Sequence, residues 1–230
     1  MFNGKRILAL IPARGGSKGI KDKNITHLCG KPLIAYSVAC GMQSKYVDSV
    51  VVTTDSEKIA EVARQYGAWV PFLRPPELAS DTAKTLDAVL HAVKSLAEMG
   101  EQYDAVLLLQ PTQPLRTSED VDGAIEAYFA QGCEDLVSVS QVSDHPILIR
   151  TVEGGRLKNL LPFSSTCRRQ DMPAYYLVNG CIYINAIERL NENTSFNDNP
   201  IPYIMKKSHS VDIDEPIDLQ VAEYYLMNGY

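Results

Sequence analysis

The sequence predicts an α/β fold in which a mostly parallel sheet carries helices on both faces. Apolar runs of strand length alternate along the chain with segments of helical period. The central runs are continuously apolar, as in strands that are buried on both faces of a parallel sheet. A length of 230 residues suits one domain with a small insertion better than two full domains.

The first part of the chain alternates regularly between strands and helices. Strands are expected at 7–11, 50–53, 69–73, 105–109 and 136–142. A first helix is expected at 32–40, where Pro32 suits the first turn because its missing N–H costs nothing there. Three more helices are bounded by cap and stop residues: Asp55 or Ser56 to Gly67, the apolar repeat from Leu86 to Leu96 before Gly100, and Thr117 or Ser118 to Gly132. This order predicts parallel strands joined by crossover helices.

The rhythm changes near Val142, where segments become shorter and turn residues gather at 153–155. A strand is expected again at 177–184, and a last amphipathic helix at 216–226. The prediction is therefore a single domain over 1–230, with an insertion at about 142–173.

Composition narrows the classes of function. The formal net charge of −6 argues against general binding to nucleic acid or to an anionic membrane, which needs a basic face. The five cysteines are scattered without a C-x-x-C pair, so neither a disulfide framework nor a zinc site is expected. The apolar run at the N-terminus is too short for a signal peptide, and no stretch is long enough to span a bilayer. These features predict a cytoplasmic protein.

A basic, glycine-rich run, Arg14-Gly15-Gly16-Ser17-Lys18-Gly19, follows the first strand. In open α/β sheets ligands bind beyond the carboxyl ends of the strands, and glycines let the backbone approach a ligand closely. Arg14 and Lys18 suit phosphate groups. The run matches neither G-x-x-x-x-G-K-S/T nor G-x-G-x-x-G. A flexible basic loop remains the alternative interpretation.

Asp212-Ile213-Asp214 is a second candidate site. In extended backbone, residues two apart point to the same side, so both carboxylates can face one hard cation such as Mg²⁺. Capping of the last helix by Asp214 is an equally good interpretation of the local sequence. The phosphate loop elsewhere in the chain favours the metal.

Three further segments are weaker candidates. Gln110 is the first polar residue after the central strand, in a proline-stiffened turn. The arginines of 168–171 suit carboxylate recognition, although a solvated loop is the better interpretation of this segment taken alone. The same holds for the segment at 74–78. The four histidines show no ligand spacing, and no Ser-His-Asp arrangement can be proposed.

Taken in order, these segments resemble the acylneuraminate cytidylyltransferases, also known as CMP-sialic acid synthetases, and their relatives that act on legionaminic or pseudaminic acid. The resemblance runs over essentially the whole chain. It rests on these residues: 11–19, 23–24, 53–55, 74–81, 110–112, 114–116, 169–170, 179–180, 182–184 and 212–214.

The resemblance implies a Rossmann-like nucleotidyltransferase fold with a small dimerisation arm, a homodimer, and transfer of CMP from CTP to a nonulosonic acid with Mg²⁺. The residues implied for CTP are Arg14, Gly15, Gly16, Ser17, Lys18, Asn24, Arg74, Ala83 and Thr85. Those implied for the sugar acid are Gln110, Arg169, Asn179, Tyr183 and Phe196, the last contributed across the dimer. Asp212 and Asp214 are implied for the metal, and Arg14, Lys18, Asp212 and Asp214 for catalysis.

Two departures from the family pattern concern the acceptor. Gln113 stands where many relatives have serine, and the segment at 145–148 lacks a lysine that some sialate enzymes carry, for which Arg150 could substitute. Two alternatives stay open. One is a cytidylyltransferase for 3-deoxy-octulosonate, whose loop usually reads Ser-Thr-Arg in place of Gly-Ser-Lys. The other is a regulatory module that binds nucleotide without catalysis.

Overall fold

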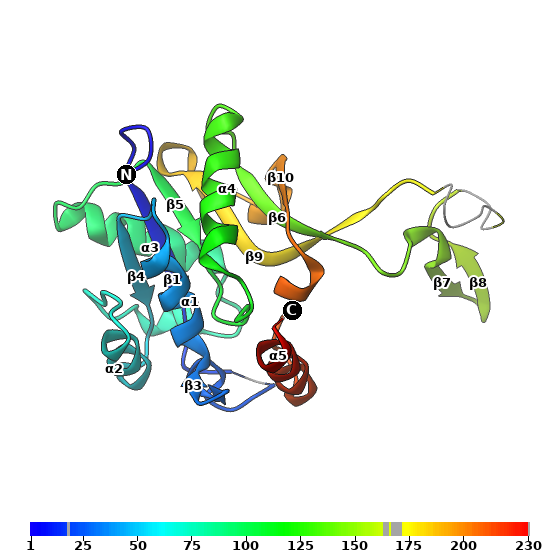
Figure 1. Cartoon of the computed structure of the whole chain (residues 1–230), viewed down its shortest axis with the longest axis horizontal. Coiled ribbons are helices and arrows are strands. Elements are labelled where there is room, and N and C mark those ends of the chain that lie inside the picture. The colour runs from blue at the N-terminus through cyan, green and yellow to red at the C-terminus, as the bar shows by residue number, and fades with distance from the viewer. Residues whose placement is uncertain (18, 163–165, 167–171, 230) are drawn as a thin grey trace.

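A six-stranded sheet with strand order β10-β6-β9-β5-β1-β4 forms the centre of the molecule (Figure 1). The computed structural model describes residues 1–17, 19–162, 166 and 172–229. The sheet strands are β1 (Ile7–Pro12), β4 (Ser49–Thr53), β5 (Ala105–Leu108), β6 (Leu136–Gln141), β9 (Tyr176–Ala186) and β10 (Ile201–Ile204). β1 is parallel to β4 and β5, and β10 is parallel to β6, whereas β9 runs antiparallel to β5 and β6. The prediction of a mostly parallel sheet is confirmed.

Helices cover both faces of this sheet, as predicted. They are α1 (Leu33–Gln43), α2 (Glu57–Gln65), α3 (Thr85–Glu98) and α4 (Ser118–Ala130); a fifth helix, α5 (Pro216–Asn228), packs beside the sheet. Because successive strand residues point to opposite faces, Ile7, Ala9 and Ile11 pack with α1, α2 and α4, whereas Leu8 and Leu10 pack with α3. Each of these fully buried leucines contributes about 1.5–3 kcal/mol of transfer free energy.

The residues that were predicted to begin and end helices are found at helix ends. Ser56 caps α2 by accepting a hydrogen bond from the Ile59 amide at 3.4 Å, and Thr117 caps α4 by accepting one from the Asp120 amide at 3.2 Å. Gly100 and Gly132 follow α3 and α4 with φ of 86° and 71°, a conformation that glycine adopts without strain.

The strand predicted at 69–73 is wrong. Only Trp69 pairs with the sheet, through an isolated parallel bridge to Val51. Pro71 has no N–H to continue the pairing. The chain turns instead, and the Arg74 amide donates to the Thr54 carbonyl at 2.7 Å. This turn brings Arg74 close to the carboxyl end of β4.

The C-terminal segments pack beside the loop that follows β1. A small ladder of β2 (His27–Leu28) and β3 (Lys31–Pro32) precedes α1. α5 packs through Ala222 on a third apolar cluster that includes Leu28, Leu33 and Ile213. No helix in the described part of the chain is long and apolar enough to cross a membrane.

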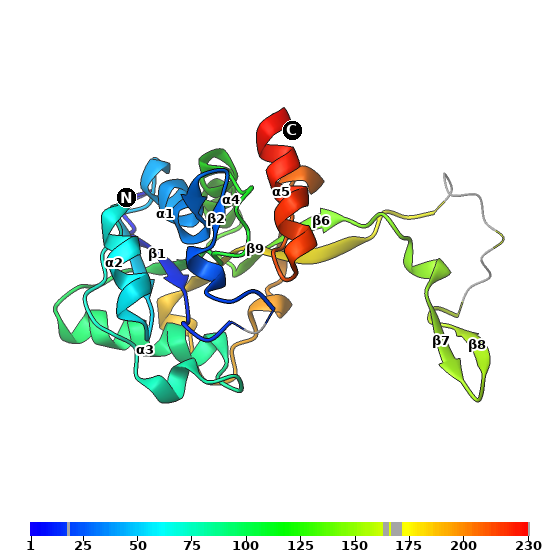
Figure 2. The same cartoon turned by 90° about the horizontal axis from the view of Figure 1, so that it is seen from below.

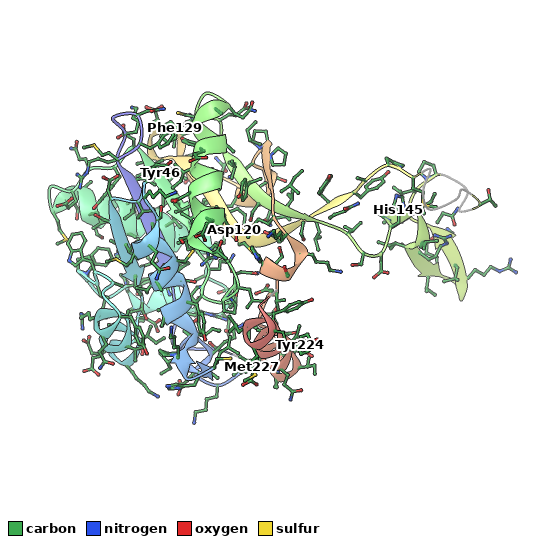
Figure 3. All side chains as sticks on the ribbon, viewed as in Figure 1. Tyr46, Asp120, Phe129, His145, Tyr224 and Met227 are labelled. Atoms are coloured by element: carbon green, nitrogen blue, oxygen red, sulfur yellow. The ribbon has the colours of Figure 1, made fainter. Side chains whose placement is uncertain are left out.

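A hairpin of β7 (Arg150–Glu153) and β8 (Arg156–Asn159) projects away from the sheet between β6 and β9 (Figures 1 and 2). We refer to the described residues of 142–175 as the arm. His145, labelled in Figure 3, lies in the arm, where its Nε2 is 3.1 Å from the Pro173 carbonyl oxygen. The change of rhythm that the sequence shows near Val142 coincides with the start of the arm.

Candidate active site

Two adjoining cavities lie at the carboxyl ends of β1 and β5. The first has a volume of about 410 Å³, and we refer to it as the nucleotide cavity because it is lined by residues that the resemblance implies for CTP; its lining includes Arg14, Ser17, Gly19, Lys23, Asn24, Arg74, Ala83, Lys84, Thr85, Gln110 and Asp214. The second has a volume of about 600 Å³, and we refer to it as the acceptor cavity because it is lined by residues that the resemblance implies for the sugar acid; its lining includes Lys84, Thr85, Gln110, Tyr183, Glu192, Phe196 and Asn197. The location agrees with the rule that ligands bind beyond the carboxyl ends of parallel strands.

The glycine-rich loop after β1 forms one wall of the nucleotide cavity. Arg14 Nη1 donates to the Ser80 carbonyl and to Asp81 Oδ1, both at 3.0 Å. The Gly15 amide donates to Asp55 Oδ1 at 2.9 Å, so this N–H is already used within the protein. The position of an added Cβ at Gly16 is open, whereas at Gly19 it would lie 2.4 Å from the Asp214 carbonyl oxygen. The third glycine therefore permits close approach to Asp214 as well as to a ligand.

Asn24 and Lys23 hold this loop in place through hydrogen bonds. Asn24 is buried, and its Nδ2 donates to the Arg14 carbonyl at 2.9 Å, so the predicted phosphate residue Asn24 also fixes the loop itself. Lys23 Nζ donates to the Ile213 carbonyl at 2.8 Å and to Asp214 Oδ1 at 3.0 Å. Lys23 thus links the two segments that the sequence analysis singled out.

Arg74 is the most buried cation of the nucleotide cavity. Its Nε and Nη2 are buried and have no hydrogen-bond partner among the described residues, and Nη2 lies 3.8 Å from Asp55 Oδ1. Burial lowers the pKa of the guanidinium, while Asp55 opposes that shift. Unpaired buried donors are costly, about 1–3 kcal/mol each, and a ligand acceptor in the cavity would remove this cost. Ala83 and Thr85, which the family resemblance implies for CTP, line the same cavity.

Asp212 and Asp214 lie on either side of the fully buried Ile213. The segment is not a strand, but Ile213 points inward and its two neighbours are exposed, which is the alternation that the sequence suggested. Desolvation by the surrounding protein raises the pKa of Asp212 although solvent still reaches it; the Thr112 hydroxyl lowers the pKa, and Asp214 raises it. In the part of the chain that is described, no cluster of three or more His, Cys, Asp or Glu could hold a metal.

The alternative role of Asp214 as a helix cap is not needed. Asp218, in the first turn of α5, accepts hydrogen bonds from the amides of Asp214 at 2.9 Å and Glu215 at 2.7 Å. The start of α5 is thus capped by Asp218 and Glu215, and the Asp214 carboxylate faces the nucleotide cavity with Lys23 as its partner.

The segment before Asp212 is fixed from α4. Asp120, labelled in Figure 3 at the start of α4, lies with its Oδ2 2.7 Å from His209 Nδ1. The same oxygen accepts from the Thr117 amide and hydroxyl, both at 3.0 Å. Because both side chains are largely buried, this contact holds the chain leading to Asp212 against the helix.

Three predicted acceptor residues meet at the acceptor cavity. Gln110 follows β5 and lines both cavities. The Tyr183 hydroxyl donates to Asn197 Oδ1 at 2.9 Å, and burial raises the pKa of Tyr183 to about 12, so it remains a neutral donor. The rings of Tyr183 and Phe196 lie 5.8 Å apart. Phe196 therefore lines a cavity of its own chain, and its contribution across a dimer stays a prediction.

Asn179 has an internal role. Its Oδ1 accepts from Ser138 Oγ at 2.6 Å and from the Cys181 amide at 3.1 Å, and its Nδ2 donates to Ser210 Oγ at 2.9 Å. Gln113 Nε2 donates to the Asn179 carbonyl at 2.9 Å. Asn179 does not line either of the two cavities; it ties β9 to β6 and to the segment before Asp212.

Two residues that were predicted for the site, Lys18 and Arg169, lie outside the described residues. Arg150, expected as a possible substitute for a lysine, donates through Nη1 to the carbonyls of Ile147 and Ile149 within the arm, at 2.6 and 2.9 Å.

Three residues of the site were not selected from the sequence. Lys23 stood in the basic run after the loop, and this charge next to Asn24 was the available signal. Asp81 and Lys84 fall within or beside the segment that resembles the family, but nothing in their local sequence distinguishes them from solvated residues. Their position at the cavity depends on the turn that precedes α3.

Comparison with known proteins agrees with this geometry. The cytidylyltransferase family model matches residues 8–153. The chain therefore belongs to the cytidylyltransferase family, whose members are nucleotidyltransferases.

Among characterised relatives, the chain is 41% identical to CMP-N,N'-diacetyllegionaminic acid synthase of Legionella pneumophila, over 95% of both chains. It is 34% identical to N-acylneuraminate cytidylyltransferase of Escherichia coli, over 94% of this chain and 51% of that protein. Among solved structures, CMP:2-keto-3-deoxy-manno-octonic acid synthetase complexed with CTP superimposes with a TM-score of 0.74, at 16% identity, over 98% of this chain and 100% of that chain. The last comparison confirms the fold.

Proposed function

We propose that this protein transfers CMP from CTP to the anomeric hydroxyl of a nonulosonic acid and releases pyrophosphate. The observation that carries the proposal is the pair of adjoining cavities in a cytidylyltransferase. One cavity is lined by several cations and two carboxylates, and the other is lined mainly by neutral polar groups. The names of the Legionella and E. coli relatives support an acidic sugar as acceptor.

CTP occupies the nucleotide cavity in this proposal. Arg74, Ala83 and Thr85 surround the base and ribose, and the two unpaired donors of Arg74 find acceptors there. Arg14, Lys18 and the Ser17 region hold the phosphates, and Lys23 adds a further positive charge nearby. Charge-assisted hydrogen bonds of this kind are roughly twice as strong as neutral ones.

Asp212 and Asp214 hold Mg²⁺ in this proposal. The donor set fits this ion, because two neighbouring carboxylates supply hard oxygen ligands and substrate phosphates and waters complete its shell. Lys23 at 3.0 Å compensates the charge of Asp214 in the absence of a cation. When bound, the ion would neutralise phosphate charge and lower the pKa of a coordinated hydroxyl.

The reaction is an in-line substitution at the α-phosphorus. The anomeric oxygen forms a new bond to the α-phosphorus, the bond from that phosphorus to the bridging oxygen breaks, and pyrophosphate leaves while the hydroxyl proton is released. Positioning and charge neutralisation dominate such reactions. Arg14 and Lys18 stabilise the charge on the leaving group, and Asn24 keeps Arg14 in place through its carbonyl.

The acceptor acid occupies the acceptor cavity. Gln110 lies at its boundary with the nucleotide cavity, Tyr183 offers a buried hydroxyl, and Phe196 offers an apolar face. Asn179 supports the strand that carries Tyr183, and Arg169 is proposed from the family resemblance.

Pyrophosphate release with CTP and Mg²⁺ tests the function directly. The acceptor panel contains N-acetylneuraminic, legionaminic and pseudaminic acids together with 3-deoxy-octulosonate. Turnover with one of the nine-carbon acids is expected. Preference for the octulosonate would support the alternative cytidylyltransferase, and CTP binding without turnover of any acid would support a non-catalytic module.

Asp214→Ala tests the metal assignment. We expect turnover to fall by about a thousandfold or more, because metal-based charge stabilisation contributes several kcal/mol. Glu98→Ala is the matched control, since it removes an exposed carboxylate near the far end of α3. Both variants should keep the thermal unfolding of the wild type. Activity like the wild type in Asp214→Ala would contradict the assignment.

We also propose a homodimer formed through the arm. Val152 and Leu157 are cross-strand partners in the hairpin, and both are 71% exposed. An isolated two-stranded hairpin is marginally stable in water, and an exposed apolar pair gains from burial against a second copy. A molar mass in solution of twice the chain mass is expected, and a monomer at all concentrations would contradict this proposal.

A further inference from the structure

Three residues line both cavities: Lys84, Thr85 and Gln110. Gln110 comes from the end of β5, whereas Lys84 and Thr85 come from the start of α3. Residues shared by two adjoining cavities lie at their boundary, where groups of the two ligands meet. Gln110 and Thr85 were expected at the site from the family resemblance, and Lys84 was not.

The two cavities differ in charge at this boundary. The nucleotide cavity has Arg14, Lys23 and Arg74 as well as Lys84. Of the described residues that line the acceptor cavity, Lys84 is the single cation and Glu192 the single anion. Among the described residues, Lys84 is therefore the cation available to an acid from the lining of the acceptor cavity itself.

The charge of Lys84 is also less compensated than that of the neighbouring cations. Arg14 is 3.0 Å from Asp81, Lys23 is 3.0 Å from Asp214, and Arg74 is 3.8 Å from Asp55. No corresponding ion pair is found for Lys84 within the residues that the structure describes. Its side chain is exposed, so it can turn toward an anionic ligand without breaking an internal contact.

We propose that Lys84 binds the carboxylate of the acceptor acid at the boundary of the two cavities. This inference rests on the proposed function. In a 2-ulosonic acid the carboxylate is attached directly to the anomeric carbon that carries the attacking hydroxyl. When that hydroxyl reaches the α-phosphorus, the carboxyl carbon is two bonds from the attacking oxygen and therefore lies at the boundary. Lys84 would fix the orientation of the anomeric carbon, and Gln110 would face it from β5.

Lys84→Met removes the positive charge proposed to bind the carboxylate and should have little effect on the fold. The backbone amide of Lys84 donates to Asp87 Oδ2 at 3.3 Å, and this contact at the start of α3 does not depend on the side chain. We expect the KM for the acid to rise about tenfold, the lower end of the range for a charge-assisted hydrogen bond, because the site is open to solvent. The KM for CTP should stay within about twofold, since three other cations line the nucleotide cavity. Lys84→Arg should recover most of the loss.

Lys94→Met is the matched control. Lys94 lies on the same helix, about 15 Å further along its axis, and its one described ion pair is the exposed contact with Glu98 at 3.9 Å. The same substitution there should leave both KM values unchanged. If both lysine variants behave alike, a general effect on α3 or on net charge explains the result and the proposal is wrong.

The acid used is the panel member with the highest kcat/KM in the wild type, together with its C1 methyl ester as an inhibitor. The inhibition constant of the ester should differ little between wild type and Lys84→Met, because the ester lacks the charge that Lys84 recognises. A larger rise in the KM for CTP than for the acid would overturn the proposal, as would an unchanged KM for the acid. Absence of turnover by the wild type with every acid would instead overturn the proposed function, so the two failures are distinguishable.

Discussion

Replacing Gly19 by alanine is expected to separate the phosphate loop from the carboxylate segment. The new Cβ would lie 2.4 Å from the Asp214 carbonyl oxygen, and real Cβ atoms essentially never approach within 3.0 Å. The contacted atom belongs to the backbone, so a side-chain rotation cannot relieve the overlap. Overpacking of this kind costs about 1–3 kcal/mol. For a domain of this size, that lowers Tm by about 2–12 °C.

The effect on activity should exceed the effect on stability. Gly19 and Asp214 both line the nucleotide cavity, so a shift between them changes the distance from phosphate-binding groups to the metal carboxylate. A displacement near 1 Å can cost about a hundredfold in rate. Pyrophosphate release with saturating CTP, together with thermal unfolding of the same preparation, measures both quantities.

Gly16→Ala provides the stability control from the same loop. An added Cβ at Gly16 meets nothing within 4 Å of protein, and its backbone is outside the left-handed region. Alanine there should raise stability by about 0.4 to 1 kcal/mol through the unfolded chain, in contrast to the loss expected for Gly19→Ala. Wild-type activity and wild-type stability in Gly19→Ala would refute the reasoning, because they would mean that close approach of Gly19 to Asp214 is not required.

Two further predictions concern carboxylates at the site. Asp81→Asn should lower the KM for CTP by about two- to fivefold at low salt, because Asp81 competes with the triphosphate for Arg14, and the effect should vanish at high salt. A higher KM would mean that Asp81 orients Arg14 for the nucleotide. Asp212→Asn should remove activity yet raise the Tm of the protein in EDTA at pH 7 by up to about 2 °C. The pKa of Asp212 is raised in the folded state, so its ionisation costs stability as pH increases. The difference in Tm should therefore narrow as pH falls, and a lower Tm for the variant at pH 7 would contradict this reasoning.

Local sequence signals predicted most of the fold because they act over short distances. The continuous apolar run of residues 7–11 predicted a strand buried on both faces, as β1 is, and Thr117 and Gly132 marked the two ends of α4. The prediction failed at 69–73, where apolar composition indicated a strand but Pro71 and the pairing of the Arg74 amide with Thr54 turned the chain away. Whether residues 69–73 form a strand or a turn therefore depends on a contact with the end of β4, which the local composition does not show.

For the candidate site, too, some features follow from the local sequence and others depend on packing between distant segments. The sequence by itself determined the order of the strands and loops, the cations of the loop after β1 and the two carboxylates on either side of Ile213, because residue type and spacing carry that information. Only the tertiary structure decided that Gly19 packs against Asp214, that Asn179 is used internally and that Phe196 lies at the cavity of its own chain. It also brought Lys84 to the boundary of the two cavities. The physical reason is that each of these relations joins segments far apart in the chain, and their distance is fixed by packing across the sheet.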